Sequence, residues 1–138
     1  MKIKFFKENV KTPAKSHLPD SGLDLFMPEA FEIKPFETKT IGLGIGVAIP
    51  EGFAGILIPR SSIAEKGLII QTSAIDPDYQ GEIHLIITNC SGNTYNFEKD
   101  NRVCSLVCVS ILNPYIEIVE NFGAETVRNK NGIGSTGA

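Results

Sequence analysis

A strict alternation of large and small residues over residues 40–50 is the feature that most limits what this chain can fold into. In "TIGLGIGVAIP" a large apolar side chain falls at every second position from Ile41 to Ile49, and glycine or alanine fills the positions between. Successive side chains of a β-strand point to opposite faces, so this pattern predicts a strand with one face in a core and the other close to a neighbouring segment. Residues 81–89, "GEIHLIITN", alternate in a similar way.

Other short β-rich runs, separated by turn residues, lie at residues 2–6, 30–33, 53–59, 102–112 and 115–119. Only "SSIAEKG", residues 61–67, has a helical pattern. Ser61 or Ser62 is placed to cap this helix, Glu65 to complete a capping box, and Gly67 to end it. Many short strands with one short helix predict a single all-β domain, which is a sandwich, a jelly roll or a small barrel.

Composition excludes several classes of protein. The chain has 138 residues, enough to bury a core without disulfides or metal, and its net charge of -3 is spread without long runs of one sign. A nucleic-acid surface would show a clustered basic excess, so no nucleic acid is expected as a partner. No apolar run approaches membrane length, and the N-terminus has no apolar leader. We therefore expect a cytoplasmic protein without membrane contact, or one of the host cytoplasm if the source is viral or a phage.

The cysteines and histidines do not suggest a metal site. Cys90, Cys104 and Cys108 have no CxxC spacing, and His17 and His84 stand apart in the sequence. The odd number of cysteines also argues against a disulfide framework. We expect buried free thiols in a reducing compartment.

The segment "AIDPDYQGE", residues 74–82, has two interpretations. A proline between two aspartates is typical of a hairpin turn. Asp76 also follows the apolar Ile75, so its carboxylate is expected at the end of a strand, partly desolvated and held in place. Such a carboxylate can orient a water molecule and remove its proton. Tyr79 offers a flat ring to a sugar or a base.

Two further segments contain groups that bind anions. In "PRSSIAEKG" the serine hydroxyls and the N–H groups at the start of the expected helix suit an anion that Arg60 clamps, although the same residues suit a helix cap and a surface arginine. Residues 131–137, "NGIGSTG", with Arg128 upstream, suit a backbone cradle for a phosphate. A glycine-rich end of this kind is also typical of a mobile tail.

Taken in order along the chain, these segments resemble the five motifs of the homotrimeric dUTPase family. "SGLDLF" is similar to the first motif, "PRSSIA" to the second, "AIDPDYQGE" to the third, "DNRVCSLV" to the fourth and "NGIGSTG" to the fifth. The likeness covers residues 21–137. It implies a distorted jelly roll of the dUTPase-like β-clip type, in agreement with the strand pattern, with a β domain over residues 1–128. It also implies that residues 129–138 are a mobile arm, exchanged between subunits of a homotrimer, that closes over a neighbour's active site.

The resemblance further implies the reaction, which is hydrolysis of dUTP to dUMP and pyrophosphate. Asp76 matches the aspartate that activates water for attack on the α-phosphorus, and Tyr79 the tyrosine that packs beneath the deoxyribose. Asp24 matches an aspartate that reaches the shell of a Mg²⁺ ion through water, while the triphosphate holds the metal. The candidate substrate-binding residues are Arg60, Ser61, Ser62, Gln71, Ile75, Tyr79, Ser105, Arg128, Ile133, Gly134, Ser135 and Thr136.

Three positions differ from the family pattern. Ile133 replaces an aromatic residue that stacks on uracil, so stacking worth roughly 1–3 kcal/mol per base is expected to be weaker. Ser105 stands where a glutamine contacts phosphate. Thr72 and Ser73 occupy a hairpin that is commonly glycine-rich, and they resist positive φ angles, so the amide of Gln71 is a candidate substitute for backbone recognition of uracil. These differences bear on affinity and selectivity more than on the reaction.

Two other functions stay open. A related dCTP deaminase needs a catalytic glutamate at the position of Ile86, where an isoleucine, expected to be buried, cannot shuttle protons. A dUTPase-like regulatory protein that binds nucleotide with little turnover would explain the three departures, although the retention of Asp24, Ser61, Asp76 and Arg128 favours an enzyme. A structural capsid-type jelly roll would leave the five motifs unexplained.

Overall fold

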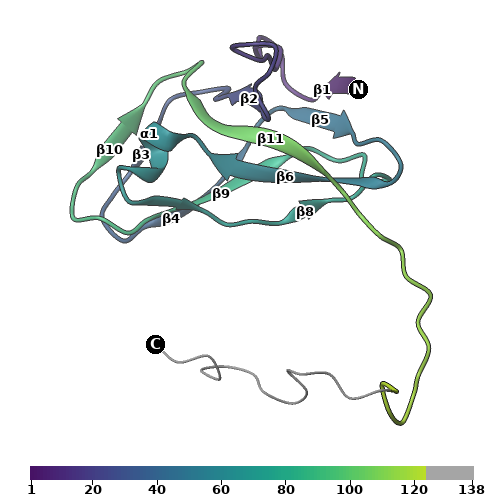
Figure 1. Ribbon diagram of the computed structural model, residues 1–138. Coiled ribbons are helices and arrows are strands. Elements are labelled where there is room, and N and C mark those ends of the chain that lie inside the picture. Colours follow the sequence, from purple (N-terminus) through teal and green to yellow (C-terminus); the bar gives the residue numbers. More distant parts are fainter. Residues whose placement is uncertain (124–138) are drawn as a thin grey trace.

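The computed structural model describes residues 1–123, which form short β-strands and one short helix (Figure 1). The elements are β1 (Lys2–Phe5), β2 (Leu23–Phe26), β3 (Phe31–Ile33), β4 (Thr38–Gly42), β5 (Ile45–Ala48), β6 (Phe53–Pro59), α1 (Ser61–Ala64), β7 (Leu68–Ile70), β8 (Ala74–Ile75), β9 (His84–Asn89), β10 (Tyr95–Phe97) and β11 (Arg102–Ser110).

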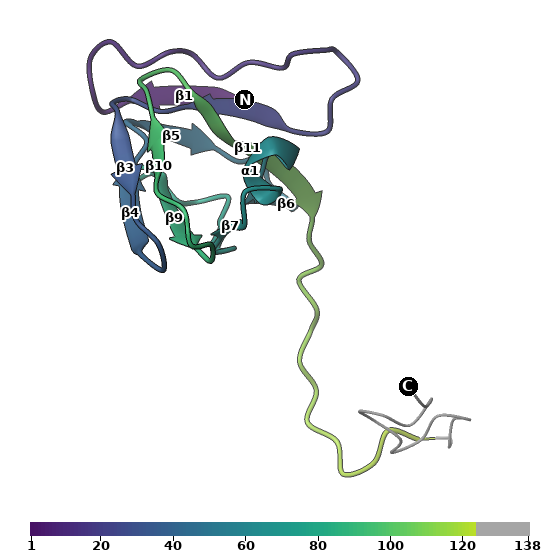
Figure 2. The ribbon, with the colours of Figure 1, turned by 90° about the vertical axis from the view of Figure 1, so that its left-hand side faces the viewer.

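The fold is all-β and jelly-roll-like, as predicted, and its strands pair in an antiparallel manner. One sheet has the order β2-β11-β6-β8, a second has the order β4-β9-β7, and β1–β5 and β3–β10 form two further pairs. Viewed from the side, these sheets curve around a common interior (Figure 2). That interior is the hydrophobic core, because Leu57 and Leu106 of the first sheet join Leu85 and Ile87 of the second in one buried cluster.

The alternating segment of residues 40–50 forms two strands instead of the one predicted. β4 ends at Gly42 and β5 begins at Ile45. Ile83 forms backbone hydrogen bonds on both sides of the break. The N–H of Leu43 donates to the carbonyl of Ile83 over 2.9 Å, and the N–H of Ile83 donates to the carbonyl of Ile45 over 2.8 Å. The extra residue is Gly44, whose φ of 72° is accessible to glycine at little cost. This bulge lets the chain leave one sheet and pair with β1.

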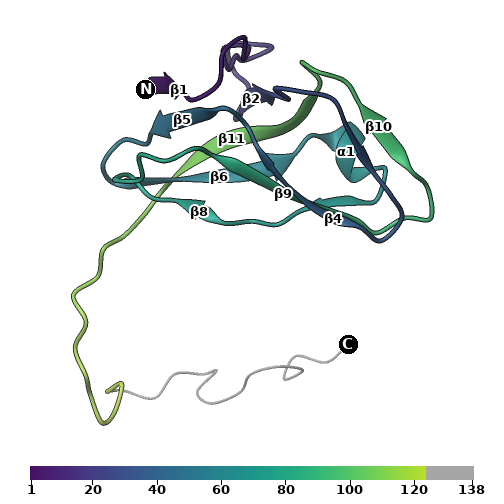
Figure 3. The same cartoon turned by 180° about the vertical axis from the view of Figure 1, so that it is seen from behind.

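The other predicted runs agree with the structure except for the last. β1, β3, β6 and β11 lie within the predicted runs 2–6, 30–33, 53–59 and 102–112. Residues 115–119 form no strand, so that prediction is wrong for the single chain. Within residues 1–123 these apolar residues find no sheet edge. After β11, residues 112–123 lead away from the body of the molecule (Figure 3).

The segment of residues 111–123 is extended and exposes large apolar side chains. Tyr115 is 93% exposed, Ile118 is 97% exposed and Phe122 is fully exposed. The hydrophobic effect disfavours such exposure in an isolated chain. The predicted boundary between a domain of residues 1–128 and an arm of residues 129–138 lies outside the described residues.

The helix is confirmed, but its predicted cap is not. α1 begins after Arg60, which is the N-cap residue, and no side chain caps it. The helix ends at Ala64, with Glu65 as its C-cap residue, so the predicted end at Gly67 is too late. Gly67, with a φ of 73° and an N–H that donates to the carbonyl of Ala64 over 2.9 Å, closes the turn that follows the helix. The hydroxyls of Ser61 and Ser62 are therefore not used in capping. No helix within residues 1–123 is long and apolar enough to cross a membrane.

The cysteines are free, although only one is buried. Cys104 is buried in β11, Cys108 is half-buried, and Cys90 is exposed. The expectation of buried thiols is therefore correct for Cys104 and wrong for Cys90, which lies at the turn after β9.

Candidate active site

A polar cleft of about 730 Å³ lies beside β2, β11 and the end of β6. It draws on three separate parts of the sequence, which the sheet order brings together because β11 pairs with both β2 and β6. The residues that line it are Ser16, His17, Asp20, Gly22, Asp24, Ile58, Pro59, Arg60, Ser61, Arg102 and Ser105. We call it the Asp24 cleft.

Asp24 is a buried acid of this cleft and is only 5% exposed. In the pairing of β2 with β11 it lies directly opposite Ser105, after a shift in register between Arg102 and Cys104. The hydroxyl of Ser105 donates to Oδ1 of Asp24 over 2.8 Å. The strand register therefore explains why Ser105, itself buried, is engaged with a carboxylate of its own chain.

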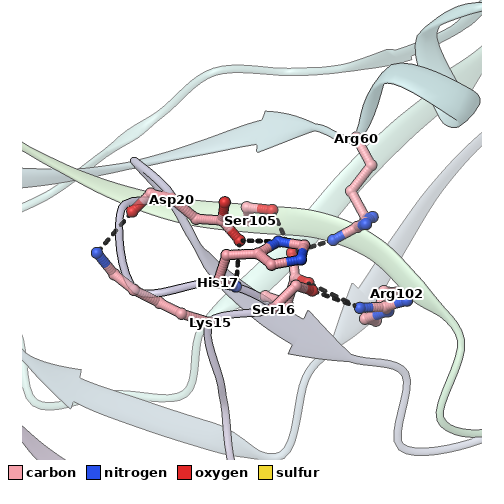
Figure 4. Close-up of polar contacts among 8 residues, drawn as sticks. Lys15, Ser16, His17, Asp20, Arg60, Arg102 and Ser105 are labelled. Atoms are coloured by element: carbon pink, nitrogen blue, oxygen red, sulfur yellow. Dashed lines mark hydrogen bonds and ion pairs between the residues drawn. The ribbon is translucent and has the colours of Figure 1, made fainter.

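Two arginines from different parts of the chain share the Asp24 carboxylate. Figure 4 shows Arg60 and Arg102 approaching this polar group together with Ser16 and Ser105. Arg60, between β6 and α1, pairs with Oδ1, and Nη1 of Arg102 lies 3.3 Å from Oδ2. Ser16 joins this group, because its hydroxyl donates to Oδ2 over 3.1 Å and accepts from Nη1 of Arg102 over 2.6 Å. Two guanidinium groups around the Asp24 carboxylate leave one positive charge beside it, which suits an anionic ligand at the arginines, while the carboxylate of Asp20 also lines the cleft.

The pKa of the Asp24 carboxyl lies below its ordinary value of 3.8. Burial is the largest single influence and acts to raise this pKa. The hydrogen bonds from Ser105, Arg60 and Ser16, together with the charge of Arg60, outweigh it. Asp24 is therefore ionised at neutral pH and holds its two arginines in place.

Cys104, next to Ser105 in β11, shows the opposite effect on an acidic group. Burial, and then the negative charge of Asp24, raise the pKa of its thiol to about 12. The thiol is therefore neutral and unreactive in the folded chain, as befits a small apolar core residue.

Asp76, the predicted catalytic residue, lies in a different pocket. β8 ends at Ile75, and the N–H of Tyr79 donates to the carbonyl of Asp76 over 3.1 Å, which closes a turn. Asp76 is exposed, not partly desolvated as expected, because nothing else within residues 1–123 packs over this turn closely enough to bury it. The pocket has a volume of about 180 Å³ and is lined by Leu57, Ser73, Ala74, Ile75, Asp76, Tyr79, Glu82, Ile83, His84 and Ile86. We call it the Asp76 pocket.

Tyr79 is held in this pocket by the backbone that follows it. Its hydroxyl donates to the carbonyl of Glu82 over 2.8 Å, and its ring covers Gly81 so closely that a Cβ at that glycine would overlap the ring. The carboxylate of Glu82 accepts from the N–H of Gly44 over 2.7 Å and ties the hairpin to the bulge between β4 and β5. The turn is thus braced against the core even though Asp76 itself is exposed.

The Asp24 cleft and the Asp76 pocket do not share a lining residue. Consecutive residues of β6 contribute to each, since Ile58 lines the Asp24 cleft and Leu57 the Asp76 pocket. Adjacent side chains of a strand point to opposite sides. Within residues 1–123 of a single chain, the first, second and fourth sequence motifs therefore meet at the Asp24 cleft, and the third motif lies apart from them at the Asp76 pocket. The fifth motif lies outside the described residues.

The predicted site residues divide between these places. Asp24, Arg60, Ser61 and Ser105 line the Asp24 cleft. Ile75, Asp76 and Tyr79 line the Asp76 pocket. Ser62 and Gln71 line neither pocket. Ser62 lines a separate cavity beside α1 with Arg60 and Lys66, and the side-chain amide of Gln71 donates to the hydroxyl of Thr88 over 3.1 Å. The remaining predicted residues lie outside the described residues: Arg128, Ile133, Gly134, Ser135 and Thr136.

Thr72 and Ser73 do not adopt the positive φ angles that a glycine would allow. The hairpin before Asp76 therefore has no left-handed backbone at these two positions. The N–H of Gln71 donates to the carbonyl of Ile86 over 2.9 Å. Ile86 is half-buried, not buried as expected, because it faces outward from β9 into the Asp76 pocket.

Six polar residues that line the two pockets were not predicted from the sequence as site residues: Ser16, His17, Asp20, Glu82, His84 and Arg102. Ser16 lies eight positions before Asp24 in a loop whose course no local pattern predicts. Arg102 is the third residue of the fourth motif and the first residue of β11, and its charge at the start of an apolar run was the available signal. His84 stood at a polar position of an alternating strand, where it was considered only as a metal ligand.

Comparison with known proteins defines the class. The sequence profile of the dUTPase family matches residues 8–137. The deoxyuridine 5'-triphosphate nucleotidohydrolase of Trichodesmium erythraeum is 36% identical over 140 residues, which cover 99% of this chain and 98% of that protein. The mitochondrial human protein of the same name is 31% identical and covers 99% of this chain, which spans 55% of the human protein.

Solved structures give the same result. A mutant dUTPase of Staphylococcus bacteriophage 80alpha with dUpNHpp superposes with a TM-score of 0.92 at 29% identity, covering 99% of this chain and 98% of that chain. A mutant dUTPase from phage phi11 of S. aureus, described with a structural Mg(II) ion, superposes with a TM-score of 0.81 at 28% identity over 88% of this chain and 97% of that chain. The protein is a β-rich nucleotide hydrolase by fold and by sequence. The chain belongs to the dUTPase family.

Proposed function

We propose that this protein hydrolyses dUTP to dUMP and pyrophosphate, with Asp76 as the general base. One observation supports this assignment above the others: the chain has a polar cleft in which two arginines, Arg60 and Arg102, suit a phosphate chain, and a separate pocket in which the carboxylate of Asp76 is exposed beside the ring of Tyr79. Phosphate binding and water activation are the two tasks that such a hydrolase has to combine.

In the reaction Asp76 takes a proton from a water molecule, whose oxygen attacks the α-phosphorus. A bond from the water oxygen to phosphorus forms, and the bond from the α-phosphorus to the bridging oxygen breaks. The electron pair leaves with that oxygen as pyrophosphate. Arg60 and Ser61 would contact the phosphate chain, and Arg60 would stabilise the charge that develops on the leaving group. Tyr79 would pack against the deoxyribose.

A divalent metal fits this arrangement only as a partner of the substrate. Among residues 1–123 no group of three or more His, Cys, Asp or Glu side chains is placed to hold a metal ion. Both oxygens of Asp24 already accept bonds from Ser105, Arg102 and Ser16 or pair with Arg60. Mg²⁺ retains waters and favours phosphate oxygens, so we propose that Mg²⁺ arrives on the triphosphate and that Asp24 meets its shell through water. The ion would neutralise phosphate charge.

We propose that the complete site forms between chains of a homotrimer. The separation of the Asp24 cleft from the Asp76 pocket supports this, because a nucleotide contacting both would have to lie between two copies. The exposed apolar side chains of residues 111–123 also favour burial against a neighbouring copy. Sedimentation should give a mass near that of three chains, and a mass near that of one chain would overturn the proposal. A cytoplasmic location is part of the same proposal.

A regulatory protein with little turnover is the second candidate. The observation that favours it is the engagement of Ser105 with Asp24 at a position where a phosphate-contacting glutamine is expected. A dCTP deaminase is disfavoured, because Ile86 in the Asp76 pocket has no proton to exchange.

The deciding experiment separates products by anion-exchange chromatography after incubation with Mg²⁺ and dUTP, dTTP, dCTP or UTP. We expect dUMP and pyrophosphate from dUTP alone. Asp76→Asn should lower kcat by at least about 100-fold, the scale of general-base catalysis, while it retains binding of the non-hydrolysable dUpNHpp. Asp78→Asn, two residues further along the same turn, is the matched control and should keep its turnover. Binding of dUTP without any product from the native protein would favour the regulatory candidate.

A further inference from the structure

The Asp76 pocket contains a histidine to which the proposed reaction gives no part. His84 is the first residue of β9 and is exposed, while Leu85 after it is buried in the core. Because side chains alternate along a strand, His84 lies on the outer face with Ile86. Both line the same pocket as Asp76.

A single backbone oxygen fixes both polar rings of this pocket. The carbonyl of Glu82 accepts the hydroxyl of Tyr79 over 2.8 Å and also contacts Nδ1 of His84 over 2.9 Å. Glu82 is itself held by the bond between its carboxylate and the N–H of Gly44. The rings of Tyr79 and His84 are therefore placed side by side by one braced residue.

This contact determines the tautomer of His84. A carbonyl oxygen has no hydrogen to donate, so Nδ1 must donate one and is the protonated nitrogen. In the neutral imidazole Nε2 is then an acceptor. Within residues 1–123 Nε2 has no hydrogen-bond partner, and it belongs to an exposed side chain at a pocket wall.

We infer that His84 is a specificity-determining residue whose Nε2 accepts a hydrogen bond from the 3′-hydroxyl of the deoxyribose. The inference rests on the proposed function, in which Tyr79 packs against the sugar. Because the Glu82 carbonyl holds Tyr79 and His84 together, the group next to His84 is the sugar rather than the phosphate chain. In a deoxynucleoside 5′-triphosphate the 3′-hydroxyl is the only hydroxyl that the sugar still offers as a donor.

The test is a cycle of two substrates and two enzymes. kcat/KM is measured for dUTP and for 2′,3′-dideoxy-UTP, which lacks the 3′-hydroxyl, with the native protein and with His84→Phe. We expect His84→Phe to lower kcat/KM for dUTP roughly 3- to 10-fold, the scale of one hydrogen bond, and to leave kcat/KM for the dideoxy substrate unchanged. The preference for dUTP should shrink by the same factor.

Two further variants keep the test specific. His84→Gln, whose side-chain carbonyl can accept a hydrogen bond, should retain part of the preference. Thr40→Val, on the exposed face of the neighbouring strand β4 and opposite Ile86, should keep the native ratio. Equal losses on both substrates, or no loss on either, would overturn the role of His84 while leaving the proposed function intact. Failure of the native protein to bind or cleave dUTP would overturn both.

Discussion

At the scale of single residues, Asp24 and Asp76 show how the same functional group is prepared for different tasks. Burial raises the pKa of the Asp24 carboxyl, but the contacts with Ser105, Arg60 and Ser16 outweigh it and lower the pKa. Arg102 also pairs with this carboxylate. A carboxylate so engaged organises cations and is a poor base. Asp76 is exposed and accepts no side-chain hydrogen bond within residues 1–123, so it is free to take a proton from water.

The lowered pKa of Asp24 predicts a specific loss of stability in acid. A carboxyl whose pKa is lower in the folded than in the unfolded state stabilises the fold above the unfolded-state value, near 3.8, and this contribution is lost as the pH falls through the folded-state pKa. Asp24→Asn should therefore reduce the free energy of unfolding at pH 7 by about 3 kcal/mol. The difference from the native protein should shrink below pH 3.8.

Urea unfolding at pH 7 and at pH 3 measures this difference. Glu51→Gln, which removes an exposed carboxylate outside both pockets, is the control and should change little at either pH. A native protein and an Asp24→Asn variant whose stabilities differ by the same amount at both pH values would contradict the assignment.

At the scale of the elements, the sequence predicted strands where the alternation was strict and failed where the partner was distant. β9 lies within a predicted run because its burial repeats every second residue. β6 and β11 were predicted from continuous β-rich runs, and their central residues are buried in succession. The break at Gly44 was missed because alternation of apolar residues continues across a bulge. The absence of a strand at residues 115–119 could not be predicted, because a strand needs a partner edge, and the sequence does not show which chain supplies it.

The bulge at Gly44 predicts that an added methyl group at this position lowers the stability of the fold. A Cβ at this position would lie 2.7 Å from Cγ2 of Val10 on a backbone with a φ of 72°. Gly44→Ala should therefore reduce the free energy of unfolding by about 1–3 kcal/mol, measured by urea unfolding. Gly52→Ala has a similar φ of 79° but open space around the added Cβ, so it isolates the cost of the backbone alone and should be the milder change. Equal effects of the two substitutions would mean that the contact with Val10 relaxes freely.

At the scale of the whole molecule, the candidate site is divided between two faces of one chain. The resemblance identified the residues of both halves in the sequence, but no pattern in one chain could show that Arg60 and Asp76 line different pockets. Which pocket a residue joins depends on the pairing of strands far apart in the sequence. Ser16, which joins Asp24 only through the packing of a loop, was missed for the same reason.

This division predicts that two inactive variants restore each other. Arg60→Ala removes a cation from the Asp24 cleft, and Asp76→Asn removes the proposed base from the Asp76 pocket. If each site takes one half from each of two chains, an equal mixture refolded together should recover about a quarter of the native activity by random assembly. Each variant refolded alone is the control and should stay inactive. A mixture as inactive as its components would place both halves of the site on one chain.

The exposed segment of residues 111–123 also has a consequence for how activity depends on the concentration of the protein. The folded body ends at Ser110, so a newly made chain has both pockets before it has met another copy. On the proposed assembly such a chain is folded but idle, and it begins to turn over substrate only when enough copies accumulate to cover their apolar segments. Catalytic output then rises more steeply than the number of chains at low abundance, so that halving synthesis removes more than half of the activity.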